Sequence, residues 1–410
     1  MIPRVFKNRS FLLLWCARTI SLLGDAFFEM GLTLLIYDKT GSTIAMGMNL
    51  IMYFVPSWIF GFIGGAAADK YTRKTIMVLS DLMRGLILMF LPVFISGDNW
   101  TPVLIYAATF VLSTLGQFCN PASGAILPQI VEGDSLVAAN SAMNTMKQLV
   151  GIVGPALAGI IIKQFGTIAT IYANMASFFI SCALVSMIRI AAGGGKSAVK
   201  EKDKGFYSVI VEGLSYVAKR ADLKVLLMLM VILNALLGPL NVILPVYADN
   251  VLGAEVAGYS SMLSGYSVGS LAGAALVGIF MKFAGIDALI AIGIAAIGIG
   301  LATLGIFANL YYAMTIMAVA GIGAGIISVI VSVMIQKTTP EDLLGRVLST
   351  MGIIGTTTAP LSIAVTSVLL NYISPNTFFI ICGFIALAFF AWYAVYSRAR
   401  GGVFKETQEE

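Results

Sequence analysis

Arg18, Asp25 and Glu29 stand inside an apolar run, residues 11–37, that is long enough for a helix to cross a membrane. Spacings of seven and eleven residues place the three charged side chains on one helical face. A charge at the membrane centre costs about 2.5–3.5 kcal/mol on insertion scales, so we expect this face to meet protein or water. Removal from water favours the protonated form of a carboxylate. Asp25 and Glu29 are therefore candidates for proton exchange and for binding a positively charged group.

The composition is that of an integral membrane protein. Of the 410 residues, 59% are hydrophobic and 11% are charged, whereas soluble domains carry about 25% charged residues. The net charge of +5 does not indicate a nucleic-acid partner, because the basic residues sit in short loops. The four cysteines lie in apolar segments, which favours packing roles. There is no histidine, so we expect no metal site, and any proton relay must use carboxylates.

Twelve apolar runs of membrane-spanning length follow one another, which predicts an all-α protein with both termini on the same side. Their approximate ranges are 11–37, 44–67, 75–96, 101–126, 142–163, 167–190, 224–248, 257–281, 285–307, 310–335, 347–371 and 375–397. No small-residue cleavage site follows the first run, so we expect it to stay as an uncleaved helix.

The basic residues predict the orientation. Of the 25 Lys and Arg residues, only Lys39 and Lys163 fall in loops on one side. Positive loops stay in the cytoplasm, so both termini are expected there.

Residues 191–223 form the one long polar segment and divide the chain into predicted parts 1–190 and 224–410. The segment begins as a Gly- and Lys-rich linker. From Phe206, apolar residues recur at spacings of three and four through Ile210, Leu214 and Val217. This spacing predicts a short amphipathic helix on the membrane surface. A solvated connector is the alternative.

The loop after the second run carries an ordered set of charges. In "GGAAADKYTRK", Gly65, Asp69 and Arg73 belong to a tight acidic and basic pattern, and "SDLMRG" follows with Asp81 and Arg84. Arg73 is expected to reach Asp81, and such pairs can hold one conformation and break in another. The alternative is that these charges serve membrane orientation alone.

The fifth run contains "GIVGPALAG", with Gly151, Gly154, Pro155 and Gly159. Small residues let helices approach closely, and the proline permits a bend. Ordinary helix packing is the alternative to a functional motif.

The two halves resemble each other. "GDSLVAANSAM" follows the fourth run, and "PEDLLGRVLSTM", with Gly345 and Arg346, follows the tenth. Duplication of a six-helix unit is a feature of transporters.

Over essentially its whole length, the sequence resembles a major facilitator superfamily transporter, in particular the bacterial macrolide-efflux and enterobactin-exporter branch. The resemblance lies in "ISLLGDAFFEMGLTLLIYDKTGS", the 65–74 loop, "LVGIVGPALAG" and "PEDLLGRVLS". It implies two six-helix bundles around a cavity that opens alternately to either side. It also implies a cytoplasmic gate at Gly65, Asp69, Arg73, Asp81, Arg84, Gly345 and Arg346, and an antiporter motif in the fifth helix.

In that architecture the first helix lines the cavity, and Asp25 and Glu29 would alternately bind protons and cargo. The alternative is that Asp25 fixes helix packing by bonding Asn144 or Gln148. The predicted cargo contacts are Asp25, Glu29, Arg18, Asn49, Asn120, Asn144, Gln148, Asn241 and Tyr266.

We therefore expect proton-driven export of amphiphilic drugs or natural products across a bacterial inner membrane by a monomer. A dedicated exporter of one metabolite or a lipid flippase is the alternative; a symporter or a non-transporting receptor is less consistent with the motifs. No nucleophile–base pair or phosphate loop is recognisable, so we expect no enzyme and no cofactor besides the proton gradient.

Overall fold

The computed structural model describes residues 4–95, 102–131, 135–189, 214–400 and 402–404 of the 410-residue chain. The regular secondary structure of these residues is entirely helical. Contacts divide the chain into two compact units, Met1–Val199 and Lys200–Glu410. The division falls within the polar segment 191–223. Most of this segment, including Phe206 and Ile210 of the expected surface helix, lies outside the described residues, while residues 214–219 are helical.

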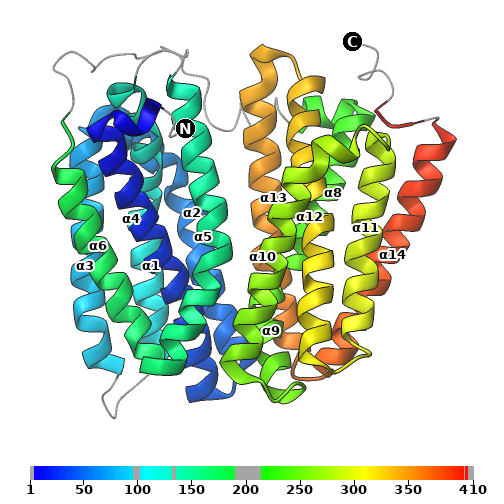
Figure 1. Cartoon of the computed structure of the whole chain (residues 1–410), viewed down its shortest axis with the longest axis horizontal. Coiled ribbons are helices and arrows are strands. Elements are labelled where there is room, and N and C mark those ends of the chain that lie inside the picture. Colours follow the sequence, from blue (N-terminus) through cyan, green and yellow to red (C-terminus); the bar gives the residue numbers. More distant parts are fainter. Residues whose placement is uncertain (1–3, 96–101, 132–134, 190–213, 401, 405–410) are drawn as a thin grey trace. The chain divides into compact units, whose positions relative to one another are not determined.

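The N-terminal unit is a bundle of six long helices preceded by one short turn of 3-10 helix (Figure 1). Its elements are η1 (Arg4–Lys7), α1 (Arg9–Thr40), α2 (Thr43–Lys70), α3 (Arg73–Ile95), α4 (Pro102–Ile130), α5 (Ser135–Phe165) and α6 (Thr167–Ser186).

From Ala221 onward, the described residues of the C-terminal unit form seven α-helices. They are α8 (Ala221–Leu237), α9 (Leu240–Asn250), α10 (Glu255–Phe280), α11 (Ile286–Leu304), α12 (Leu310–Thr338), α13 (Glu341–Leu369) and α14 (Pro375–Ala399).

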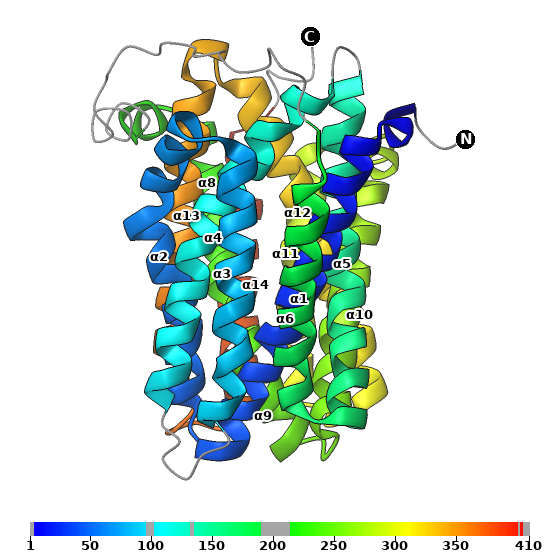
Figure 2. The same cartoon turned by 90° about the vertical axis from the view of Figure 1, so that its left-hand side faces the viewer.

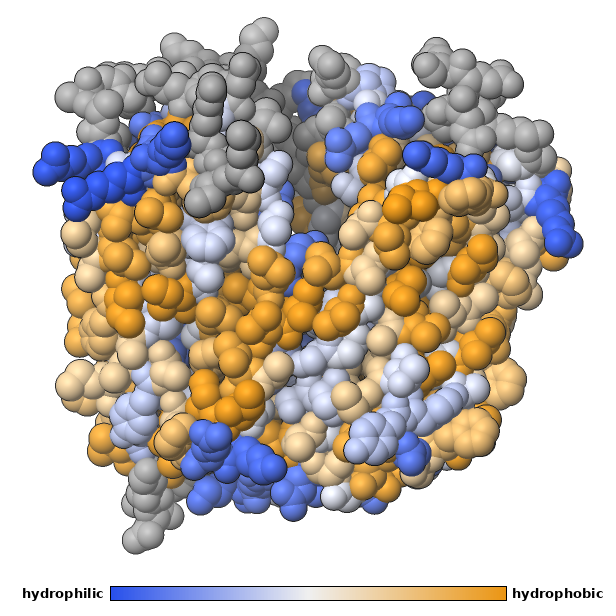
Figure 3. All heavy atoms as spheres, viewed as in Figure 1, coloured by the Kyte–Doolittle hydropathy of each residue, from blue (hydrophilic) through white to orange (hydrophobic). Residues whose placement is uncertain are grey.

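The predicted number of twelve membrane spans is confirmed within the described residues, because twelve helical segments are long and apolar enough to cross a bilayer. The outer side chains are also those of a membrane protein. Val93, Val103 and Phe283 are 69%, 66% and 84% exposed. On the face drawn in Figure 3, apolar side chains cover the middle of the helices and hydrophilic ones gather toward their ends. Such a band suits contact with lipid hydrocarbon.

The seventh span differs from the single helix expected over 224–248. It consists of α8 and α9, which are separated by a turn at Gly238 and Pro239. Pro239 has no amide hydrogen to donate and its ring interferes with the preceding helical turn, so the helix breaks there.

Several helices extend beyond their apolar cores. α2 continues to Lys70, so Gly65 and Asp69 lie in the last turns of a helix and not in the expected loop. Gly345 and Arg346 likewise lie inside α13. Apolar length marks the membrane-crossing part of a helix, whereas its backbone hydrogen bonding can continue into water.

Within the N-terminal unit, α1 packs against α6 and α5, α3 against α6 and α4, and α2 against α4 (Figure 2). Side chains tie the helix ends together at the side predicted to be cytoplasmic. Asn8 Nδ2 donates to the carbonyl of Ile130 at 2.6 Å, and Lys74 Nζ donates to that of Ile188 at 2.9 Å. The start of α1 is thereby held to the end of α4, and the start of α3 to the residues that follow α6.

Candidate functional site

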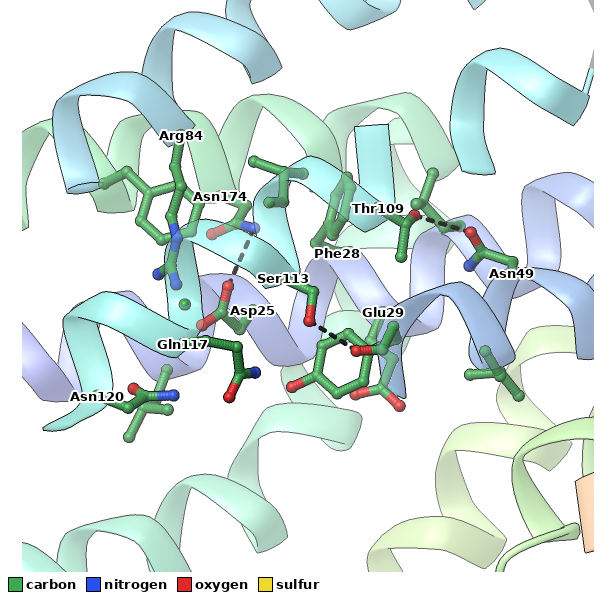
Figure 4. A pocket seen from close by; sticks show the side chains of 17 residues that line it. Asp25, Phe28, Glu29, Asn49, Arg84, Thr109, Ser113, Gln117, Asn120 and Asn174 are labelled. Atoms are coloured by element: carbon green, nitrogen blue, oxygen red, sulfur yellow. Dashed lines mark hydrogen bonds between the residues drawn. The ribbon is translucent and has the colours of Figure 1, made fainter. Parts of the chain in front are cut away.

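Side chains from α1, α2, α3, α4 and α6 line one pocket inside the N-terminal unit (Figure 4). The space measures about 820 Å³ including its open mouth. Its lining residues are Leu22, Asp25, Phe28, Glu29, Leu32, Asn49, Leu50, Tyr53, Arg84, Thr109, Leu112, Ser113, Gly116, Gln117, Asn120, Asn174 and Phe178.

The two carboxylates of α1 both line this pocket but have different surroundings. Asn174 Nδ2 on α6 donates to Asp25 Oδ1 at 3.5 Å, a long hydrogen bond. Glu29 is exposed, and its carboxylate forms no hydrogen bond or ion pair with any residue that the structure describes. The alternative, in which Asp25 bonds Asn144 or Gln148, is not what the structure has, and Glu29 is the more available of the two acids.

Close packing of α1 on α6 places Asp25 beside Asn174. A Cβ added at Gly24 would collide with Ser177 Oγ on α6, and one added at Gly31 would collide with Thr170 Oγ1. Glycine is the residue that permits this approach, since it has no Cβ.

Asp81 on α3 is completely buried behind the pocket wall. Ser181 Oγ donates to its Oδ2 at 2.7 Å, and Cys119 Sγ lies 3.8 Å from its Oδ1. Arg84 Nη1 stands 3.9 Å from the same Oδ1. The expected Arg73–Asp81 pair is not formed, because Arg73 Nη1 donates to the Ala125 carbonyl at 2.9 Å. Asp81 thus belongs to the interior of the bundle.

Arg18 is buried beside the pocket without lining it. Its Nη2 donates to Asn120 Oδ1 at 2.8 Å and its Nη1 to Cys119 Sγ at 3.4 Å. The guanidinium therefore orients Asn120, which does line the pocket. Its expected direct contact with cargo remains a prediction.

Arg84 points into the pocket on the side of Asp25 (Figure 4). Its Cζ lies 5.1 Å from the centre of the Phe178 ring, within cation–π distance. Gly116 on α4 leaves room for the guanidinium, because an added Cβ would stand 2.5 Å from Nη2. Arg84 thus belongs to the pocket wall, and the gate role that the family resemblance implies for it stays a prediction.

Polar side chains of α4 face the pocket in a row. Thr109 Oγ1 donates to Asn49 Oδ1 at 2.8 Å, and Ser113 Oγ donates to the Tyr53 carbonyl at 2.6 Å. Thr109, Ser113 and Gln117 recur every four residues, a helical spacing that could have revealed this face from the sequence. The sequence placed Asn49 and Asn120 at the site but missed Tyr53, Thr109 and Ser113 as lining residues.

Besides Arg18, four other predicted cargo contacts lie outside this pocket. Asn144 and Gln148 are exposed on α5. Asn241 on α9 and Tyr266 on α10 are partly buried in the C-terminal unit. Their roles stay predictions.

The remaining motif residues have mixed settings. The structure describes the helical backbone at Gly65, Asp69 and Gly345 but not their surroundings, while Arg346 is partly buried.

In the fifth-helix motif, a Cβ at Gly154 would stand 2.8 Å from Ala26 Cβ on α1, whereas one at Gly151 would meet nothing within 4 Å. Pro155 and Gly159 are buried in α5. Gly154 therefore permits close packing of α5 on α1.

The C-terminal unit has its own partly buried polar contact, at the N-terminal end of α11. Tyr393 Oη donates to Asp287 Oδ1 at 2.7 Å, and the Val403 amide donates to Oδ2 at 3.1 Å. Tyr247 on α9 is fully buried and donates to the Leu304 carbonyl at 2.8 Å, so its role is structural.

Twelve helices that could span a membrane, together with a pocket lined by charged side chains inside the N-terminal unit, are the features of a multi-pass membrane transporter. Solved transporters have the same fold. The nucleoside transporter NupG superimposes with a TM-score of 0.77 at 12% identity, covering 94% of this chain and 99% of that one. A bacterial homologue of the iron transporter ferroportin, in an inward-facing state, gives 0.75 at 13% identity, covering 96% and 99%.

The chain belongs to the transmembrane secretion effector family of the major facilitator superfamily, whose family model matches residues 4–395. Macrolide efflux protein A of Streptococcus pyogenes is 23% identical over 378 residues, 91% of this chain and 92% of the relative. The multidrug efflux pump Tap of Mycolicibacterium fortuitum is 26% identical over 368 residues, 87% and 88% of the two chains. These findings confirm the family resemblance and point to a transport protein and not an enzyme.

Proposed function

We propose that this protein exports positively charged, amphiphilic drugs or related natural products across the bacterial cytoplasmic membrane. The observation that carries the proposal is the pocket of the N-terminal unit, where two carboxylates stand among aromatic and apolar side chains. A carboxylate without a partner attracts a cation strongly where water is scarce. The efflux relatives support the direction of transport, since macrolide and multidrug efflux are what their names describe.

The proposed energy source is the proton gradient. Asp25 and Glu29 can each carry either a proton or the positive charge of cargo, so the two ligands compete. Protonation from outside would release the cargo, and loss of the proton to the cytoplasm would permit reloading. This cycle requires the pocket to open alternately to each side.

The proposal includes the orientation of the protein in the membrane and its oligomeric state. The distribution of basic residues supports a cytoplasmic location for both termini. We take the protein to act as a monomer, with Gly65, Asp69, Arg73, Gly345 and Arg346 at the cytoplasmic gate. The close contact of Gly154 with Ala26 supports a role for the fifth-helix motif in moving α5 against α1.

The decisive experiment measures accumulation of fluorescent or labelled drugs, including a macrolide, in an efflux-deficient bacterium. Parent protein, Asp25→Asn, Glu29→Gln and the double variant are compared at matched membrane levels, with and without a protonophore. We expect the parent to lower accumulation, the protonophore to abolish the effect, and the double variant to lack it. Gradient-driven export by the double variant would contradict coupling through these acids. If no compound moves, a dedicated metabolite exporter or a lipid flippase becomes the better hypothesis.

A further inference from the structure

Arg84 is an unusual element of the pocket wall, because its donors are unused. Only 5% of the residue is exposed, yet its side chain donates no hydrogen bond to any residue that the structure describes. Its Nε is fully buried without a partner. The nearest carboxylate contact, to Asp81, is 3.9 Å long. A buried guanidinium that makes no hydrogen bonds is costly, so its free donors indicate that an acceptor binds there.

Arg18, the other buried arginine near the pocket, uses its donors, whereas Arg84 does not among the residues that the structure describes. Arg18 is equally buried at 5% exposure, but it donates to Asn120 and Cys119 and does not line the pocket. Arg84 instead lies over the Phe178 ring, which leaves the edge of the guanidinium open to the pocket. Gly116 preserves that opening, because any larger residue would approach Nη2.

The charges around the pocket decide which kind of acceptor fits. Its lining contains two acids, Asp25 and Glu29, and a single base, Arg84. With all three charged, a negative charge is in excess, and a cargo with one positive charge balances it. A carboxylate on the cargo, bound at Arg84, would leave one negative charge in excess again. It would also lie near the carboxylates of Asp81 and Asp25. An uncharged oxygen can accept from the guanidinium without that repulsion.

We propose that Arg84 recognises an uncharged oxygen acceptor on the exported compound, so that the favoured cargo is an amphiphile with one positive charge and a nearby carbonyl, ester or hydroxyl group. The cation lies at Glu29 and Asp25, and the oxygen accepts from Arg84. This inference rests on the proposed function in that it takes the pocket as the cargo site. It gives Arg84 a role in specificity, distinct from proton exchange by the acids.

Three rhodamine-type dyes test the proposal, because they share one xanthylium cation and differ at one ring position. Tetramethylrosamine carries hydrogen there, tetramethylrhodamine methyl ester carries an uncharged ester, and tetramethylrhodamine carries a carboxylate. Binding to the purified full-length protein in lipid nanodiscs is measured by fluorescence polarisation at one pH. We expect the ester to bind about tenfold more tightly than the rosamine, and more tightly than the acid.

Matched variants assign the preference to Arg84. Arg84→Met should reduce the ester-to-rosamine affinity ratio to about one, and Arg84→Lys should reduce it while keeping the charge. Arg18→Lys is the control and should preserve the ratio. Gly116→Ala keeps Arg84 but displaces its guanidinium, so it should also lower the ratio. Because each ratio compares two dyes on one protein sample, partial loss of folded protein does not alter it.

The opposing results are equally definite. An ester-to-rosamine ratio near one in the parent, a ratio that survives Arg84→Met, tightest binding of the acid, or no binding of any dye would overturn the proposal. Gradient-driven uptake of the same dyes into everted membrane vesicles separates this inference from export. If the dyes are taken up but the ester-to-rosamine affinity ratio is near one, export stands and the role of Arg84 fails. If the ratio is as expected but no dye is taken up, the role of Arg84 stands and export fails.

Discussion

Asp25 and Glu29 lie one helical turn apart on α1, yet their surroundings give them different tasks. Asp25 accepts a hydrogen bond from Asn174, while the carboxylate of Glu29 is exposed in the pocket and unpaired among the described residues. A group that already has a partner gains less from a bound cation than one that has none. We therefore expect Glu29 to contribute more to cargo affinity, and Asp25 to link the pocket to α6.

Cation binding should weaken as the pH falls. Protonation of Glu29 removes the negative charge that attracts the cation, so tetramethylrosamine should bind about tenfold less tightly at the acidic end of a titration. Glu29→Gln should bind weakly at every pH and show a flatter profile. Fluorescence polarisation over a pH series measures both. Because the dye cation has a fixed charge, only the protein titrates, and a steep profile in Glu29→Gln would move the main role to Asp25.

Helices α1 and α6 contact each other through glycines of α1, and the stability of the N-terminal unit depends on that contact. Gly24→Ala should destabilise the protein by about 1–3 kcal/mol, because the added Cβ collides with Ser177. Gly151→Ala is the matched control on α5, since its Cβ meets nothing within 4 Å. It should be neutral or stabilising by up to about 1 kcal/mol through helix propensity. Thermal unfolding in detergent compares them, and equal effects would show that the α1–α6 contact can relax.

The ends of α11 and α14 are joined by a partly buried hydrogen bond. Tyr393→Phe should cost about 1–3 kcal/mol of stability, because Asp287 loses the donor at 2.7 Å while staying partly buried. Tyr396→Phe is the control on the same helix, where the ring stacks on Trp392 at 5.2 Å. Thermal unfolding of both variants is the measurement. A Tyr393→Phe protein as stable as the control would mean that Asp287 is satisfied without the hydroxyl.

At the scale of the whole molecule, the placement of basic residues predicts a single orientation in the membrane. Alkaline phosphatase, which is active only outside the cytoplasm, should be active when fused after Gly41 and inactive when fused after Thr72. Green fluorescent protein at the C-terminus should fluoresce, because it folds in the cytoplasm. The reverse pattern would invert the direction assigned to every gate and pocket residue.

The sequence by itself determined the class of protein, the number of membrane spans and the importance of α1. These follow from apolar length, charge placement and helical spacing, which are local properties of the chain. It also placed Asp25, Glu29, Asn49 and Asn120 among the cargo contacts, and all four line the pocket. Even so, the ends of helices were missed, because a helix can continue past its apolar core, as α2 does to Lys70.

Only the tertiary structure decided which side chains meet. Asn174 pairs with Asp25 from a position 149 residues away, and Ser181 donates to Asp81 from 100 residues away. Arg84 could be read as a gate residue from its motif, but the packing of α3 against α4 and α6 turns it toward the pocket. Which side chains contact each other in a helix bundle depends on how each helix is rotated about its own axis. It also depends on how closely two helices approach, as Gly24 does to Ser177. Those are set by packing between distant segments, which spacing along one helix does not encode.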